Sequence, residues 1–396
     1  MKLIPLSMLS LFATLSFAAS PAETAIKQAL TSIEKQPAHY PYYNALAMAY
    51  TRRARETSDV RFYARAEETL KQSFALAPDN FDGRKVETAI QLGRHDYGKA
   101  LETATRLNKM VPDDLAVYGY LVDANIELGN YKDAVRAAQW MIDLRPGNAP
   151  GLARAGYLRE LHGNLSGALE LMKLAYDATP PAESEDRARL LTQMAHVELM
   201  SGDISKAEAD ATGALAVFPD YHYALAALAQ VRIAQKRYQD AVALLARRYN
   251  AAPRAENLYW LAQAQWLDGR REEALASFAE FERQALAESA LPDNSNRELL
   301  LYYLDRAGEP AKALEIARRE VERRHDIFTL DSYAWALAAN GDYRAADAQI
   351  QQALAFGVKD PGVLFHAGAI AAGFERSGAA ADLPRSLLVK TEVGVR

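Results

Sequence analysis

The residue types that could perform chemistry are spread thinly along this chain and form no recognisable motif. The histidines are His39, His95, His162, His196, His222, His325 and His366. No two of them lie three or four residues apart, so no helix can present two histidines to one metal ion. The sequence also lacks a glycine-rich phosphate loop, a G-x-S-x-G nucleophile elbow and an H-E-x-x-H zinc motif.

The acidic pairs are equally uninformative about catalysis. Glu67-Glu68 and Glu272-Glu273 are adjacent in the sequence, so on a helix each pair points to two different sides. We therefore predict no catalytic residue, no cofactor and no metal, and a protein that is not an enzyme. An enzyme with an unrecognised site is the weakest of the alternatives.

The composition is that of an ordinary soluble protein, with 50% hydrophobic and 24% charged residues among 396. The net charge of −5 does not favour binding to nucleic acid. Because the chain contains no cysteine, disulfides, thiol chemistry and cysteine-based metal sites are excluded.

The N-terminal stretch "MKLIPLSMLSLFATLSFAAS" predicts a secretory signal peptide over residues 1–18. Lys2 is followed by no charged residue until Glu23, and the small residues Ser16 and Ala18 precede a cut after residue 18. The expected location is periplasmic or secreted, with no membrane span after cleavage. An uncleaved N-terminal anchor is the alternative, because the uncharged run approaches the length needed to cross a bilayer.

One alanine recurs every 33 to 39 residues with similar neighbours. It stands at Ala66, Ala100, Ala134, Ala168, Ala207, Ala241, Ala274, Ala313 and Ala346. Five residues before it a glycine recurs, at Gly129, Gly163, Gly202, Gly269, Gly308 and Gly341. Twelve residues after it a proline recurs, at Pro78, Pro112, Pro146, Pro180, Pro219 and Pro253. A period of this length predicts an array of stacked units rather than separate globular domains.

The segment "YGYLVDANIELGNYKDAVRAAQWMIDLRP" carries most of a pattern that resembles the tetratricopeptide repeat. The resemblance implies an all-α, right-handed α-solenoid of antiparallel helix pairs, wound into a superhelix. Glycine suits the left-handed end of the first helix, and proline stops the second. The predicted organisation is a half-repeat helix over 19–39, nine repeats over 40–360, and a degenerate tenth repeat or capping helix and tail over 361–396. The nine repeats are approximately 40–80, 81–114, 115–148, 149–182, 188–221, 222–255, 255–288, 294–327 and 327–360.

Insertions interrupt the period at three places. "PPAESEDR" and "ESALPDNSN" are polar, proline-containing stretches that we interpret as loops. "TRRARETSDVRF" lengthens the first hairpin, and we interpret its arginines as a solvated face, with a docking site as the alternative.

The resemblance also implies where a ligand binds, because the first helix of each repeat lines the concave surface of such arrays. Transferring those positions predicts a peptide-binding groove formed by Tyr157, Tyr223, Gln230, Tyr259, Gln263, Trp266, Tyr302, Asp305, Asp331 and Trp335. The same transfer includes Asp123, Glu160, His196 and Glu298. Tyrosine and tryptophan are good contact residues because they combine large area with a polar group. The alternative is that several of these aromatic rings pack between helices and never meet a ligand.

The sequence thus predicts a non-enzymatic scaffold outside the cytoplasm that binds a protein or peptide of unknown identity. Envelope assembly, secretion or maturation are the settings that the resemblance implies. The alternative is a structural protein that forms homo-oligomers through its ends or its convex face.

Overall fold

The computed structural model describes residues 19–289, 291 and 296–376, without the side chains of 374–376. The predicted signal peptide and the tail of the predicted tenth repeat lie outside the described residues.

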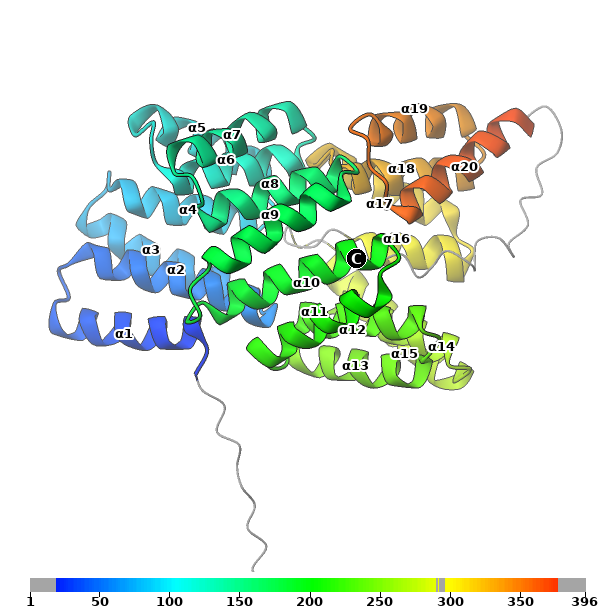
Figure 1. Ribbon diagram of the computed structural model, residues 1–396, viewed down its shortest axis with the longest axis horizontal. Helices are drawn as coiled ribbons and strands as arrows, with labels where there is room; N and C mark the ends of the chain where they lie inside the picture. The colour runs from blue at the N-terminus through cyan, green and yellow to red at the C-terminus, as the bar shows by residue number, and fades with distance from the viewer. Residues whose placement is uncertain (1–18, 290, 292–295, 377–396) are drawn as a thin grey trace, which may run out of the picture.

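Twenty α-helices follow one another along the described chain, and these residues contain no strand. The first ten are α1 (Pro21–Lys35), α2 (Tyr40–Thr57), α3 (Arg61–Leu76), α4 (Phe81–Gly93), α5 (Tyr97–Met110), α6 (Leu115–Glu127), α7 (Tyr131–Leu144), α8 (Ala149–Leu161), α9 (Leu165–Ala178) and α10 (Ser184–Met200). The others are α11 (Ile204–Val217), α12 (His222–Ala234), α13 (Tyr238–Ala251), α14 (Ala255–Leu267), α15 (Arg271–Glu288), α16 (Arg297–Tyr302), α17 (Pro310–Arg323), α18 (Ile327–Ala339), α19 (Tyr343–Leu354) and α20 (Pro361–Arg376). Figure 1 shows them as a succession of antiparallel pairs.

The recurring alanine lies where the helices of a repeat pack together. Each of the nine alanines has an exposed fraction of 0%, on the second helix of its pair. A side chain of this size lets neighbouring helices approach closely, and the stacked pairs bury a continuous core. The prediction of an all-α solenoid of antiparallel helix pairs is therefore confirmed.

The turn inside most repeats depends on a left-handed residue. Gly129 and Gly163 follow α6 and α8 with φ of 74° and 73°. Lys236 replaces glycine in the sixth repeat and still adopts φ of 60°. The first helix of the eighth repeat departs from the pattern, because α16 continues as a π-helical turn, Tyr303–Ala307.

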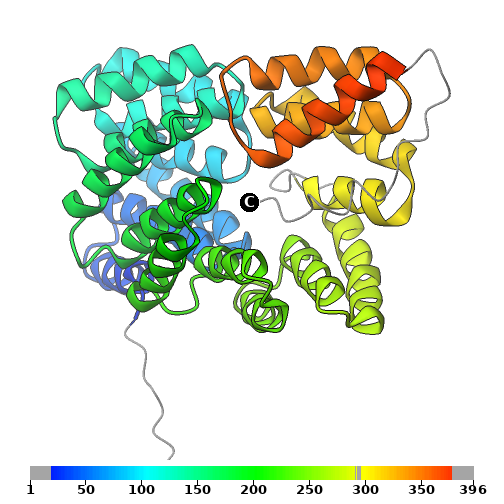
Figure 2. The same cartoon turned by 45° about the vertical axis from the view of Figure 1, so that its right-hand side comes forward.

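The array curves until it meets itself along two contact zones. Figures 1 and 2 show the helices arranged around a common centre, and the contacts between distant repeats close that arrangement. We name these zones by their chemistry, as the ionic seam and the aromatic seam.

The ionic seam joins α2 to the start of α10 and to α12. Arg52 Nη2 lies 2.7 Å from Glu183 Oε2, and Arg55 Nη2 lies 3.1 Å from Glu185 Oε2. A ring nitrogen of His222 lies 3.2 Å from the backbone carbonyl oxygen of Arg55. The interpretation of the first-repeat arginines as a solvated face is wrong for Arg52, whose side chain is only 19% exposed, whereas Arg55 is exposed and still pairs across the seam. Glu183 and Glu185 belong to the inserted stretch "PPAESEDR", so an insertion supplies their partners.

The aromatic seam joins the turns after α6 and α8 to the ends of α17 and α19. The rings of Tyr131 and Phe356 stack with centroids 4.4 Å apart, and Tyr131 Oη accepts a hydrogen bond of 2.8 Å from the backbone N–H of Ile327. The backbone N–H of His325 donates to the carbonyl oxygen of Glu127 at 2.9 Å.

Candidate binding site

A cavity of about 930 Å³ lies at the centre of the closed array. Its walls come from α2, α6, α8, α9, α10, α12, α13, α14 and α16, together with the connections between α9 and α10 and between α17 and α18. The two seams therefore close the array around the concave surface, and the cavity stays partly open to solvent, whereas the repeat pattern alone predicts an open groove. Figure 2 shows the ring of helices around this centre.

Three of the ten predicted site residues line the cavity: Tyr157, Tyr223 and Gln230. Tyr223 has an exposed fraction of 45%, which is large for an aromatic residue. The transferred positions Asp123, Glu160, His196 and Glu298 also line it. The first helices α6, α8, α10, α12 and α16 thus bring these side chains together, as the transferred positions require. Their role in binding peptide stays a prediction.

Tyr259 and Gln263 are buried in the packed array and bind each other. Their exposed fractions are 2% and 5%, and Gln263 Nε2 donates to Tyr259 Oη at 2.7 Å. The Tyr259 ring also packs edge-on against Phe278 and beside Phe281. These two predicted residues serve the core between α14 and α15, as the alternative interpretation expects of several aromatic rings.

Asp331 and Trp335 are covered by the last helix, α20. His366 of α20 binds the Asp331 carboxylate at 2.9 Å and stacks on Trp335 with ring centroids 4.4 Å apart. Asp305 lies in the same region, and burial raises the pKa of its carboxyl to about 6. These three predicted residues form a polar cluster inside the C-terminal repeats and do not line the central cavity.

Trp266 and Tyr302 are half-buried and have partners within the array. The guanidinium group of Arg271 lies 3.7 Å from the Trp266 ring centroid, and Tyr302 Oη lies 3.3 Å from Glu282 Oε2. Neither residue lines the central cavity.

The cavity wall also holds charged and aromatic residues that the transferred positions missed. Arg154 donates to both oxygens of Asp123, at 2.8 and 2.6 Å. Trp260 Nε1 donates to Glu298 Oε1 at 3.3 Å. Arg248 reaches the cavity from α13, a second helix, where the transferred positions place no ligand contact. The sequence holds one signal for Arg248, because it is a charged residue at a position that is buried in the other repeats.

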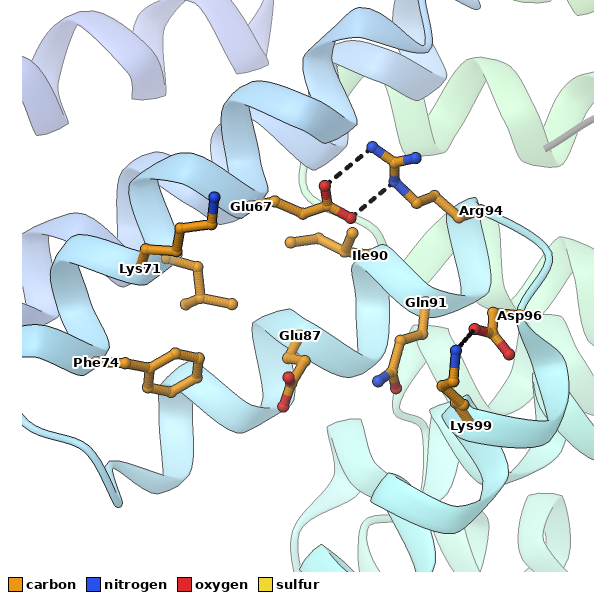
Figure 3. Close-up of a pocket in the computed structure, with 10 residues that line it drawn as sticks. Glu67, Lys71, Phe74, Glu87, Ile90, Gln91, Arg94, Asp96 and Lys99 are labelled. Carbon is orange, nitrogen blue, oxygen red and sulfur yellow. Dashed lines mark hydrogen bonds and ion pairs between the residues drawn. The ribbon is translucent and has the colours of Figure 1, made fainter. Parts of the chain in front are cut away.

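A second cavity of about 400 Å³ lies between α3, α4 and α5 (Figure 3). Its charged groups are engaged with one another or with neighbours: Arg94 pairs with Glu67 and Lys99 pairs with Asp96. Because these charges are already satisfied on the surface, this cavity is a weaker candidate for a binding site than the central one.

Within the described residues, no group of three or more potential ligands is arranged to hold a metal ion. In the same part of the chain, no helix is both long and apolar enough to cross a membrane.

Comparison with known proteins finds similarity of fold alone. No family model matches the chain, and neither does any curated protein sequence. Among solved structures, the chain is similar to the APC/C hetero-tetramer Cut9–Hcn1, with a TM-score of 0.49 and 11% identity over 88% of this chain and 58% of that one. It is also similar to the human IFIT1 dimer with m7Gppp-AAAA, with a TM-score of 0.49 and 12% identity over 86% and 96%. A third is PilW, described as a widely conserved type IV pilus biogenesis factor, with a TM-score of 0.40 and 15% identity over 52% and 92%. The chain spans 58% of the length of the first of these, and none of the three likenesses carries an argument about function.

Proposed function

We propose that this protein is a non-enzymatic scaffold that binds a protein or peptide segment in its central cavity. One observation carries the proposal: a cavity of about 930 Å³ is lined by polar and aromatic side chains from successive first helices. Binding pockets of roughly 300–1,000 Å³ with a few oriented polar groups are typical of ligand sites.

The lining favours a peptide over a purely apolar ligand. Tyr157, Tyr223 and Trp260 offer large ring surfaces, and Gln193 and Gln230 offer amide groups that can both donate and accept hydrogen bonds. A peptide backbone presents the same alternation of donors and acceptors, so an extended segment can satisfy amides on the wall while its side chains cover the rings.

The proposed setting is the cell envelope or the exterior, in assembly, secretion or maturation. It is supported by the N-terminal stretch 1–18, with its early lysine, uncharged run and small residues before the cut. Fractionation of the native cell and N-terminal sequencing test this part. A mature chain that begins at Ala19 in the exported fraction is the expected result, and a cytoplasmic chain that keeps Met1 would contradict it.

Site-specific photo-crosslinking tests the binding role. A photoreactive amino acid at Tyr223 lies on the cavity wall, and one at Leu275 lies on α15, where the residue has an exposed fraction of 59% and does not line the cavity. We expect a discrete crosslinked partner from position 223 in living cells and none from position 275. A partner captured only from position 275 would move the binding surface to the outside of the array, and equal capture from both would show no specificity for the cavity.

A further inference from the structure

Arg248 occupies a position that the other repeats use to build their core. It lies seven residues after the recurring alanine, on the buried stripe of α13 with Ala241, Val242 and Leu245. The equivalent residues are Ser73, Leu107, Met141, Ala175, Ala214, Phe281, Glu320 and Ala353. All eight are buried, and six of them are apolar. An arginine at this position is therefore an exception to the packing rule of the array.

The two other polar residues at this position have partners inside the array. Asn296 Nδ2 donates to Glu320 Oε1 at 2.9 Å, and Ser73 Oγ donates to Asn44 Oδ1 at 2.6 Å. Arg248 has an exposed fraction of only 6%, and its Nε is buried without a hydrogen-bond partner. Within the described chain its guanidinium group forms no ion pair, and it faces the central cavity.

A buried guanidinium group without a partner is costly, because it cannot shed its charge as a lysine or histidine can. Burial lowers the pKa of Arg248, but an arginine stays protonated at any physiological pH. Such a group is tolerated where a ligand supplies the missing acceptor, and the pair is then strong because the site is shielded from water.

Neighbouring carboxyl groups attract Arg248 at a distance, but within the described residues none of them forms an ion pair with the arginines of this wall. Arg297 also lines the cavity, and its Nε is buried without a partner. The nearby carboxyl groups are Glu256 and Glu298, and neither forms an ion pair with Arg248 or Arg297 among the described residues. Burial, and then the Glu298 carboxylate, raise the pKa of Glu256, so its proton is held more tightly than that of an exposed glutamate.

The other cavity arginines already have carboxylate partners. Arg55 binds Glu185 at 3.1 Å, and Arg324 lies 3.1 Å from Asp326. Arg154 binds Asp123, as described above, and Arg189 lies 3.8 Å from Asp186. The guanidinium groups of the cavity that lack a carboxylate partner in the described chain therefore lie together, on the wall formed by α13 and α16, where an anion can accept their hydrogen bonds.

We propose that Arg248, assisted by Arg297, binds the carboxylate of an aspartate or glutamate side chain in an extended peptide segment that occupies the central cavity. The lining continues on both sides of α13, from α6 to α12 and from α14 to α16. A segment that fills the cavity thus runs past Arg248, which favours a side chain over the end of a chain. Tyr223 and Trp260 flank this wall and cover the neighbouring residues of the peptide. The assignment rests on the proposed peptide-binding function and specifies its ligand.

Three matched hexapeptides test the proposal by calorimetry with the full mature chain. The first contains two central glutamates between tyrosines and is blocked at both ends by acetyl and amide groups. The second replaces both glutamates by glutamine, and the third is the glutamine peptide with a free C-terminal carboxylate. We expect the glutamate peptide to bind at least tenfold more tightly than either glutamine peptide.

Two neighbouring substitutions separate ligand binding from folding. Arg248→Met removes the cavity charge, whereas Arg247→Met removes an exposed arginine on the same helix that pairs with Asp220 at 2.7 Å. We expect Arg248→Met to abolish the preference for glutamate, Arg297→Met to weaken it less, and Arg247→Met to leave it intact. Without peptide, Arg248→Met should unfold at the same or a higher temperature than the wild type, because an unpaired buried charge has been removed.

The alternatives give different results. Equal binding of the glutamate and glutamine peptides, or a glutamate preference that survives Arg248→Met, overturns the carboxylate site. If the glutamine peptide with a free C-terminus matches the glutamate peptide, the side-chain assignment is overturned. A marked loss of stability in Arg248→Met, or no saturable binding of the glutamate peptide, overturns the proposal as well. Crosslinking from position 223 is an independent result, so a partner captured there keeps the scaffold function even when the carboxylate site fails.

Discussion

The ionic and aromatic seams close the same array by different chemistry. The ionic seam is built from arginine and glutamate side chains of α2 and α10. The aromatic seam is built mainly from stacked rings and from hydrogen bonds of backbone N–H groups at the start of α18, with one ion pair of 3.7 Å between Arg324 and Glu127. Salt screens the attraction between charged side chains, and water can hydrate them when they separate. Stacked rings and backbone hydrogen bonds form only when the two surfaces are closely packed.

The glycines of the turns show this difference in fit. A Cβ atom at Gly129 would lie 2.6 Å from the carbonyl oxygen of His325, and one at Gly163 would lie 2.5 Å from that of Gly357. A Cβ atom at Gly202 would meet nothing within 4 Å. Each of the two turns at the aromatic seam thus requires its glycine for two reasons. The backbone is left-handed there, and a distant loop approaches too closely for a Cβ atom. The aromatic seam is therefore the rigid side of the closed array, and the ionic seam is the adjustable side.

Acidification is expected to have the largest effect, because a histidine with a strongly lowered pKa lies at or near each seam: His222, which is buried, and His95, which is partly buried. Burial, reinforced by Arg248, lowers the pKa of His222 to about 3, and burial with Arg324 does the same for His95. In the unfolded chain both titrate near 6.5. Their stabilising contribution is therefore complete above pH 6.5 and is lost progressively as the pH falls toward 3, because the unfolded chain then binds more protons than the folded one.

Urea denaturation between pH 7 and pH 4 measures this loss. His222→Gln removes the titrating ring and retains a donor for the carbonyl oxygen of Arg55, so it should flatten part of the pH dependence. Exposed His39 is the control, and His39→Gln should leave the pH dependence unchanged. An identical slope in His222→Gln and the wild type would contradict the assignment of acid sensitivity to this seam.

Tyr131→Ala is expected to cost about 3 kcal/mol of unfolding free energy, through lost ring burial and an unpaired backbone N–H at Ile327. Tyr238→Ala is the matched control, since Tyr238 stands at the same repeat position and is half-buried away from both seams. Hydrogen exchange over residues 320–330 should accelerate in Tyr131→Ala and not in Tyr238→Ala. Equal losses of stability in the two variants would mean that the seam contributes nothing beyond the repeat itself.

Much of this architecture is predictable from local sequence, and the reason is physical. The alanine, glycine and proline positions act within one repeat, where a small side chain, a left-handed turn and a helix stop each have a direct consequence. The seams join residues far apart in the sequence, from 130 positions for Arg55 and Glu185 to 225 positions for Tyr131 and Phe356. Their existence depends on small rotations summed over many repeats, which no single repeat encodes.

The same distinction between local and long-range effects applies to the residues of the candidate site. Tyr157 and Gln230 line the cavity as the transferred positions require, because repeat geometry alone directs them inward. Trp335 does not, because α20 packs its His366 across it. The repeat alignment places Arg248 at a core position, where a charged residue is unusual. That it lines a cavity follows only from closure of the array.

Gly129→Ala and Gly202→Ala compare the turns directly. In both variants an alanine must adopt the left-handed conformation, which lowers the free energy of unfolding by about 1 kcal/mol. Gly129→Ala should lose about 2 kcal/mol more, because its Cβ atom displaces the loop at His325. Thermal unfolding of the two variants gives the difference. If they unfold together, the backbone contact at the aromatic seam yields without cost, and that seam is not the rigid one.

Arg55→Gln is expected to show the smallest effect, about 1 kcal/mol, although Glu185 is fully buried. Glu185 keeps Arg52 at 3.8 Å and a hydrogen bond of 3.3 Å from Tyr221 Oη, so it is not left without partners. The control is Arg61→Gln, which breaks an exposed pair with Asp59 and should change stability little.

Salt separates the two seams in this last comparison. Raising the salt concentration should reduce the difference between Arg55→Gln and the wild type, because screening weakens the pair in the wild type and has nothing to weaken in the variant. The cost of Tyr131→Ala should stay constant over the same range, since ring stacking and backbone hydrogen bonds carry no net charge. A salt dependence of equal size in both variants would show that the seams are coupled, with the loosening of one transmitted through the array to the other.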